Sequence, residues 1–277
     1  MTSEPAVYAS GLRAPEGPAF DRAGRLFVVE MDAATVQRVD ADGSLHPFVC
    51  TGARPNGLAF HRDGDLYVAE AGLGAVLRVP PSGRPYMFAD AGDEPFRNPN
   101  DLAFDTDGGL YVTDPVKGSV APDGRVYYID PEGEVRLFAD GLRFPNGVVL
   151  TADGGTVLVA ESRAGAIRAY TLDAPGRAGT QRIRVELVPP ADRGGPGGLA
   201  VAEDGHLYVA LSRHGAVAVV APDDTVVERI PVGADRPSNV AFGGPDRRLL
   251  FVTEVDSGTV RIVPTVRRGL ALYGEAA

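Results

Sequence analysis

The chain has 277 residues, of which 44% are hydrophobic and 23% charged, with 35 glycines, 23 prolines, one cysteine and no tryptophan. So many glycines and prolines predict many turns and argue against a helix bundle. The net charge of −10 excludes the basic surface that nucleic acid or an anionic membrane requires. A lone Cys50 excludes an internal disulfide framework and a zinc site made of thiolates from this chain.

No segment approaches the roughly 18 apolar residues of a membrane span, and residues 1–5 lack the basic and apolar stretches of a secretory signal. We therefore expect a soluble cytoplasmic protein that acts on a small molecule, with no nucleic-acid or membrane partner. For the oligomeric state we favour a monomer.

A repeated pattern organises the chain. A short run that starts at or near a proline recurs at residues 15–20, 55–60, 99–104, 145–150, 196–201 and 237–242. A turn follows each run, and then a second apolar run at 25–30, 65–70, 110–114, 157–161, 207–211 and 249–254. Third runs (76–79, 126–129 and 260–263) and fourth runs (86–89 and 135–138) follow in several copies.

These repeats predict the fold. Four short strands in each unit of about 45 residues, with Gly and Asp turns between them, are typical of a β-propeller blade. Six antiparallel blades use residues 1–277 as one domain. Residues 6–12 resemble the fourth run before residue 145, so the N-terminus is expected to supply the outer strand of the last blade. A large β-sandwich is the alternative fold, but it gives no reason for six nearly equal steps.

The first strand of each blade should line the central channel, which brings six residues to one mouth. They are Glu16, Asn56, Asn100, Asn146, Gly197 and Ser238. A carboxylate and three carboxamides on one axis call for a cation or ordered water between them. Their oxygens suit Ca²⁺, Mg²⁺ or Mn²⁺. The alternative is that Pro-Asn-Gly is ordinary turn chemistry.

Other polar residues are expected near the same mouth. Arg163 and His214 lie in loops after second strands, and His214 is either a general acid or base or a solvated loop residue. Acids also end five of the six second strands (Glu30, Glu70, Asp114, Glu161 and Glu254). Recurrence in blade after blade favours a scaffold role for these acids, such as capping backbone amides.

Several stretches resemble the senescence-marker protein/gluconolactonase (regucalcin-like) family of six-bladed propellers, which includes sugar lactonases. They are Glu16-Gly17-Pro18, residues 98–105, residues 111–115, Phe144-Pro145-Asn146-Gly147 and residues 237–244. The resemblance implies one divalent ion at the axis, commonly calcium, held here by Glu16, Asn100 and Asn146. The family's fifth-blade Asp, a metal ligand and candidate general base, is replaced by Gly197.

The leading interpretation is a lactonase-type hydrolase that acts on a small lactone or related cyclic metabolite through this ion. Asp101 or Glu16 would then be the acid or base, and Asn56, Arg97, Arg163, His214 and Ser238 would contact substrate. Either Asp101 or a water beside Gly197 would take the place of the missing Asp. Two alternatives stay open, with or without a bound cation: a non-hydrolytic biosynthetic enzyme and a non-catalytic ligand-binding propeller.

Overall fold

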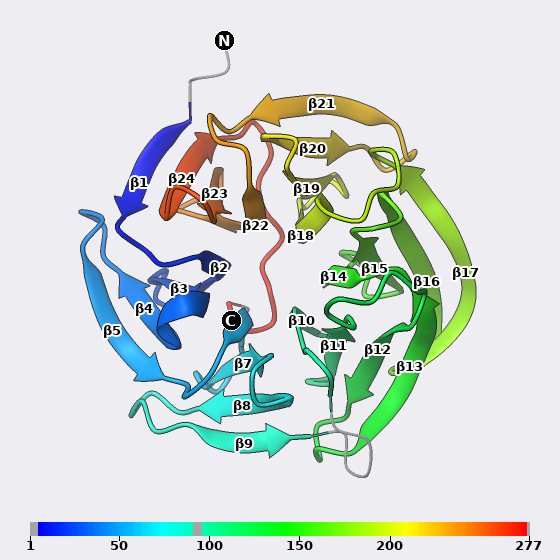
Figure 1. The fold of residues 1–277 in the computed structure, drawn as a ribbon, viewed down its shortest axis with the longest axis horizontal. Coiled ribbons are helices and arrows are strands. Elements are labelled where there is room, and N and C mark those ends of the chain that lie inside the picture. Colours follow the sequence, from blue (N-terminus) through cyan, green and yellow to red (C-terminus); the bar gives the residue numbers. More distant parts are fainter. Residues whose placement is uncertain (1–4, 91–95, 276–277) are drawn as a thin grey trace.

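Each repeat forms one blade. The computed structural model describes residues 5–90 and 96–275, and this part of the chain forms six four-stranded antiparallel sheets around a central channel (Figure 1). The all-β six-bladed propeller predicted from the repeats is confirmed. The described residues include one short helix, the 3₁₀ turn η1 (Met31–Ala33).

The strands follow the same order in every blade, from the channel outward. The innermost strands are β2 (Pro15–Phe20), β6 (Pro55–Phe60), β10 (Leu102–Phe104), β14 (Pro145–Leu150), β18 (Gly195–Val201) and β22 (Pro237–Gly243). The second strands are β3 (Leu26–Glu30), β7 (Leu66–Glu70), β11 (Leu110–Asp114), β15 (Thr156–Glu161), β19 (Leu207–Ser212) and β23 (Leu249–Glu254). The third strands are β4 (Thr35–Val39), β8 (Ala75–Val79), β12 (Gly124–Ile129), β16 (Ala166–Ala174), β20 (Ala216–Val220) and β24 (Thr259–Pro264). The outer strands are β5 (Leu45–Cys50), β9 (Tyr86–Ala89), β13 (Val135–Leu142), β17 (Arg177–Glu186), β21 (Val226–Pro231) and β1 (Ala6–Ser10).

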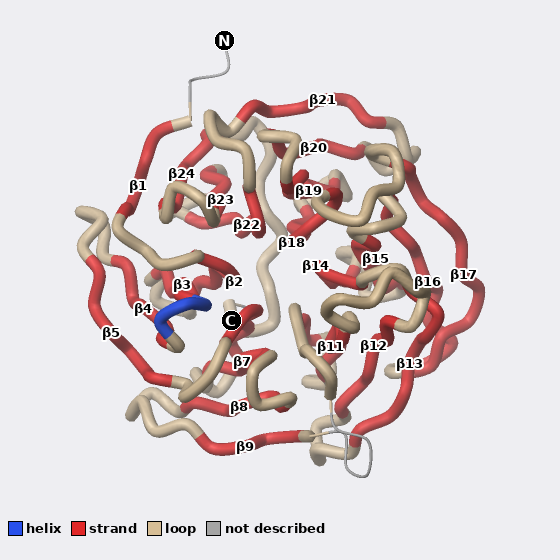
Figure 2. Tube along the Cα trace, viewed as in Figure 1, coloured by secondary structure: helices blue, strands red, loops and turns tan. Residues whose placement is uncertain are grey.

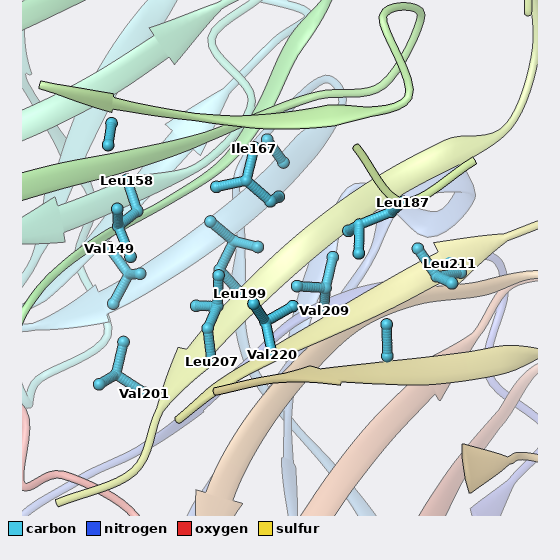
Figure 3. Close-up of a cluster of buried hydrophobic side chains, with 13 residues drawn as sticks. Val149, Leu158, Ile167, Leu187, Leu199, Val201, Leu207, Val209, Leu211 and Val220 are labelled. Atoms are coloured by element: carbon cyan, nitrogen blue, oxygen red, sulfur yellow. The ribbon is translucent and has the colours of Figure 1, made fainter. Parts of the chain in front are cut away.

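The second strands are continuous apolar runs because both of their faces are covered by neighbouring blades. Every residue of β3, β7 and β11 is buried. The core is correspondingly divided into clusters between adjacent blades. One cluster joins Leu158 and Ile167 of the fourth blade to Leu207 and Val209 of the fifth (Figure 3).

The N-terminal strand closes the ring. β1 pairs antiparallel with β24, with Ala6 opposite Ile262 and Ser10 opposite Thr259. Its Ala9 is buried in the cluster shared by the first and last blades. The predicted closure is therefore confirmed, and it covers a strand edge that would otherwise be open.

The C-terminal segment was not anticipated from the repeats, which end at Pro264. Residues 265–275, here called the strap, leave the last blade and run across the channel at the end opposite the starts of the first strands (Figure 2). The Leu270 amide donates to the Val201 carbonyl at 2.9 Å, and Tyr273 reaches the far side, where its ring lies 5.3 Å from that of Phe104. Among the described helices, none is long and apolar enough to cross a membrane.

Candidate functional site

The six residues predicted at the channel mouth are here called the mouth ring (Glu16, Asn56, Asn100, Asn146, Gly197 and Ser238). Five of them are the second or third residue of an innermost strand, and Asn100 lies two residues before β10. The next residue in each blade forms a second ring, the inner ring (Gly17, Gly57, Asp101, Gly147, Gly198 and Asn239).

Glu16 is a buried carboxyl group, with a relative exposure of 9%. Its Oε2 accepts a hydrogen bond from the Gly17 amide at 3.1 Å, and the side chains of Ser238 and Asn239 also hydrogen-bond it. Burial raises the pKa of Glu16 to about 8, and the nearby charge of Asp101 adds to the rise against these hydrogen bonds. A proton or a cation is therefore favoured at this carboxylate.

Asp101 is the second buried acid of the site, with a relative exposure of 8%. Its Oδ1 accepts from the Leu102 amide at 3.0 Å, and its Oδ2 accepts from the Val148 amide of the next blade at 3.4 Å. Burial raises the pKa of Asp101 to about 7 although these hydrogen bonds lower it. Neither Asp101 nor Glu16 forms an ion pair with any residue that the structure describes. The site is thus a pair of buried acids without a protein cation.

Asn239 joins the two acids, and the sequence interpretation missed it by choosing its neighbour Ser238. Its side chain hydrogen-bonds both Glu16 and Asp101, while its Oδ1 accepts from the Val240 amide at 2.7 Å. The backbone amide of Asn239 donates to Thr253 Oγ1, just as the backbone amide of Asp101 donates to Thr113 Oγ1. A signal existed in the sequence, because Asp101 and Asn239 are the two inner-ring positions that are not glycine.

The glycines of the inner ring let neighbouring blades approach each other closely. A Cβ on Gly57 would lie 2.6 Å from Asp101 Oδ1, and a Cβ on Gly147 would come under 3.0 Å from the Gly197 carbonyl oxygen. No side chain larger than hydrogen fits at either place without a shift of the neighbour. The blades are consequently packed closely against one another at the inner ring.

Gly197 has little room on the side where a side chain would begin. A Cβ built on Gly197 would lie under 3.0 Å from the backbone carbonyl oxygen of Ser238. The neighbouring blade therefore occupies this space, and a Gly197→Asp substitution would require that backbone to move. Of the two replacements considered for the family's Asp, the geometry favours Asp101.

The carboxamides of the mouth ring are half-buried. Asn146 Nδ2 donates to Ser162 Oγ at 3.1 Å, and that hydroxyl donates in turn to the Pro196 carbonyl at 2.6 Å. The hydrogen bond to Ser162 holds the side-chain amide of Asn146 with its nitrogen toward the protein. Asn56 and Asn100 are also half-buried, and they occupy the equivalent positions of the mouth ring in their own blades.

The expected substrate-binding residues divide into two groups. Ser238 is buried against Glu16, and its hydroxyl donates to the Pro15 carbonyl at 3.1 Å and pairs with Thr253. Arg97, Arg163 and His214 lie in loops at the mouth end and, within the described chain, do not hydrogen-bond Glu16 or Asp101. The Arg163 guanidinium stacks 4.8 Å from the Phe144 ring centre and donates to the Asp192 carbonyl, whereas His214 is exposed.

The acids that end the second strands have the predicted scaffold role. Each accepts a hydrogen bond from a backbone amide in the loop that leads into its own blade. The pairs are Arg13 with Glu30, Arg54 with Glu70, Arg97 with Asp114, Arg143 with Glu161 and Arg236 with Glu254. These contacts fix the loops from which the mouth ring begins.

The family assignment rests on most of the chain. A model of the SMP-30/gluconolactonase/LRE-like region matches residues 14–256. The chain belongs to this family. This assignment confirms the resemblance of its third, fourth and sixth repeats to those propellers.

Several SMP-30/gluconolactonase relatives are similar to the chain. Pentonolactonase XacC of Haloferax volcanii is 32% identical over 130 residues, and the 6-deoxy-6-sulfogluconolactonase of Pseudomonas putida is 28% identical over 130 residues. Each match covers 47% of this chain and 44% of the relative, so the chain spans under half the length of these curated relatives.

Solved structures are similar over nearly the whole chain. A gluconolactonase from Xanthomonas campestris has 25% identity and a TM-score of 0.81, covering 93% of this chain and 88% of that one. Regucalcin from Agrobacterium tumefaciens, described as a calcium-binding protein, has 20% identity and a TM-score of 0.84, covering 97% and 95%. The latter similarity supports the fold.

The donor set of this family member fits a hard divalent cation. Among the described residues no group of three or more His, Cys, Asp and Glu side chains could hold a metal. Any ion at the axis would therefore combine carboxylate with carboxamide oxygens, the ligand type that Ca²⁺ accepts. Two buried carboxyl groups without a cationic partner favour such an ion electrostatically.

Proposed function

We propose that the protein is a divalent-cation-dependent lactonase that hydrolyses the lactones of small sugar acids. The observation that carries the proposal is the buried pair Glu16 and Asp101, joined by Asn239 where the innermost strands converge. The names of the similar pentonolactonase, sulfogluconolactonase and gluconolactonase support the reaction and the substrate class.

Glu16, Asn100 and Asn146 would hold the ion, with Ca²⁺ proposed ahead of Mg²⁺ and Mn²⁺ because oxygen donors of mixed charge suit it. When bound, the ion polarises the lactone carbonyl as a Lewis acid. The Asp101 carboxylate takes a proton from the attacking water as the water oxygen bonds to the carbonyl carbon. The ester carbon–oxygen bond then breaks, and Asp101 returns the proton to the leaving alkoxide, which gives the open-chain hydroxy acid.

Asn239 has a positioning role in this proposal. Its carboxamide fixes both carboxyl groups relative to each other, so that the proton acceptor and the metal ligand keep one geometry. Burial of the pair limits bulk water and strengthens the electrostatic interactions at the reacting atoms. The loops that carry Arg97, Arg163 and His214 lie at the same mouth and would meet the polar groups of the substrate.

The proposal is tested by measuring hydrolysis of D-glucono-1,5-lactone, a pentonolactone and a plain aliphatic lactone with Ca²⁺, Mg²⁺, Mn²⁺ or EDTA. Glu16→Gln and Asp101→Asn should each lower kcat/KM on the preferred lactone by about 100-fold or more, since each removes a charge from the reacting site. Glu132→Gln is the matched control, because Glu132 is exposed in the turn between β12 and β13.

Calcium binding by calorimetry separates the possible results. Loss of calcium binding and of hydrolysis in Glu16→Gln supports the proposal. Hydrolysis of no lactone with any of the three ions contradicts it and leaves the ligand-binding propeller or the non-hydrolytic enzyme. Wild-type rates in Glu16→Gln would also contradict it.

A further inference from the structure

A cavity of about 290 Å³ lies on the channel axis beyond the inner ring, away from the mouth. Its walls include the same apolar position from every innermost strand, here called the apolar collar. The collar consists of Phe20, Phe60, Phe104, Leu150, Val201 and Phe242. Each of these six apolar side chains also packs into a cluster between two blades, and none of them offers ordered water a polar partner on this part of the wall.

The inner ring forms the polar end of the cavity. Asp101 and Asn239 line it, whereas Glu16 does not, because Glu16 belongs to the mouth side of the ring. Asp101 Oδ2 is 3.4 Å from the Val148 amide, and Asn239 Oδ1 is bonded to the Val240 amide. A molecule in the cavity would thus meet Asp101 and Asn239 at one end, the apolar collar around it, and polar groups of Arg62 and Glu275 beside the strap.

The strap forms the other end. Its residues 270–275 line the cavity, and Tyr273 lies between the Phe104 ring, at 5.3 Å, and the guanidinium carbon of Arg62, at 4.1 Å. The Leu272 amide donates to Glu275 Oε2 at 3.0 Å, which folds the end of the strap back on itself. Figure 1 shows the strap passing inside the ring of innermost strands.

We propose that this cavity is a second small-molecule site, for an uncharged and mainly apolar compound with one hydrogen-bonding group directed at Asp101 and Asn239. An apolar cavity of about 150 Å³ is enough for benzene, so about twice that volume suits a compound of about ten to fourteen non-hydrogen atoms. A carboxylate ligand is disfavoured because two acids, Asp101 and Glu275, and one cation, Arg62, line the space. The proposal goes beyond lactone hydrolysis, although Asp101 would serve both sites.

The test uses 1-naphthol, a neutral bicyclic compound with one hydroxyl, and 1-naphthoate, its anionic counterpart. At 1 mM, 1-naphthol should raise the Tm of the full chain by about 2 °C or more, and 1-naphthoate should not. A crystal soaked in 1-naphthol should show the ring inside the apolar collar with its hydroxyl toward Asp101.

Val201→Phe enlarges a side chain in the cavity wall to the residue that four of the six blades carry at this position. It should weaken 1-naphthol binding at least tenfold by calorimetry, and Leu150→Phe is a second variant of the same kind. Val227→Phe, on the exposed face of β21, is the matched control and should bind as the wild type does. Lactone hydrolysis should be unchanged in Val227→Phe.

Three results would overturn the proposal. One is a wild-type chain that does not bind 1-naphthol, and another is equal binding in a folded Val201→Phe or Leu150→Phe variant. The third is a crystal with the compound outside the collar. A failure of lactone hydrolysis with intact 1-naphthol binding would contradict the proposed function alone.

Discussion

At residue 101 the third repeat carries a carboxylate where four of the other five repeats carry glycine. The backbone amide of Asp101 donates to Thr113 Oγ1, as that of Asn239 donates to Thr253 Oγ1 in the sixth blade. One substitution within a repeated frame thus places a second acid beside Glu16. This explains how the site has two carboxyl groups without the family's fifth-blade Asp.

The two acids predict a pH profile that depends on calcium. Without a cation, the pKa of Asp101 is about 7 and that of Glu16 about 8, so both become carboxylates only as the pH rises from about 6 to 9. At a limiting calcium concentration, hydrolysis should therefore rise over this window. Calcium favours the charged forms and should move the rise to lower pH by at least about one unit.

The measurement is initial rates from pH 5.5 to 9 at limiting and saturating calcium, with the spontaneous alkaline hydrolysis of the lactone subtracted at each pH. Glu16→Gln supplies a second baseline. Superimposable profiles at the two calcium concentrations would count against an ion bound to these carboxylates.

Glu70 offers a separate prediction about stability. It is fully buried, and its Oε2 has no hydrogen-bond partner among the described residues, whereas Gln37 and Arg168 reach the equivalent atoms of Glu30 and Glu161. The residue seven positions after Glu70 is the apolar Leu77. Burial raises the pKa of Glu70 to about 7.

A folded-state pKa above the unfolded value means that Glu70 stabilises the fold when protonated. This contribution is full below about pH 4.5 and is lost as the pH rises to about 7. Glu70→Gln should therefore raise the free energy of unfolding at pH 8 by about 1–3 kcal/mol and add little at pH 5. Glu161→Gln is the matched comparison and should lower it by about 1–3 kcal/mol, because Arg168 loses its partner. Urea unfolding of both variants at pH 5 and pH 8 measures these free energies. Equal effects of Glu70→Gln and Glu161→Gln would contradict the prediction.

At the scale of single elements, β1 is the strand on which ring closure depends. It is far in sequence from β24 but supplies the fourth strand of that blade. Deleting residues 1–12 exposes the β24 edge and removes Ala9 and Leu12 from the core. We expect a fall in Tm of about 10 °C or more, since edge pairing and apolar burial are lost together.

A synthetic peptide of residues 1–12 should restore part of the lost Tm when added to the truncated protein. A peptide of the same composition in scrambled order serves as the control. If the truncated chain keeps the wild-type Tm, the pairing of β1 with β24 does not contribute to the stability of the ring.

The sequence predicted the blades well because each repeat carries its own turn and apolar signals. It did not predict the strap, because residues 265–275 have no counterpart in the other repeats and make their contacts with distant blades. At the site, ring position pointed to Glu16, and Asp101 was chosen because it could replace the family's missing Asp. Asn239 was missed, although it is the other inner-ring residue that is not glycine. The lack of room beside Gly197 likewise depends on how closely two blades pack, which spacing along the chain does not report.

At the scale of the whole molecule, every blade of a closed ring packs against two neighbours, so none can unfold without exposing two interfaces. The cluster between the fourth and fifth blades shows this, with Ile167 on one side and Leu207 on the other (Figure 3). The expectation of one domain across residues 1–277 then becomes a prediction about cooperativity. Damage to one interface should destabilise all six blades together.

Leu207→Ala tests this, because Leu207 is 0% exposed and lies in that cluster. It should lower the free energy of unfolding by about 2–5 kcal/mol, the cost of a large cavity in a packed core. The nine tyrosines are spread over several blades, so tyrosine fluorescence and far-ultraviolet circular dichroism should give coincident urea transitions in both proteins. Leu137→Ala, at a position 52% exposed on β13, should change stability by less than about 0.5 kcal/mol. A separate early transition in Leu207→Ala would mean that the fourth and fifth blades unfold on their own, against the single domain.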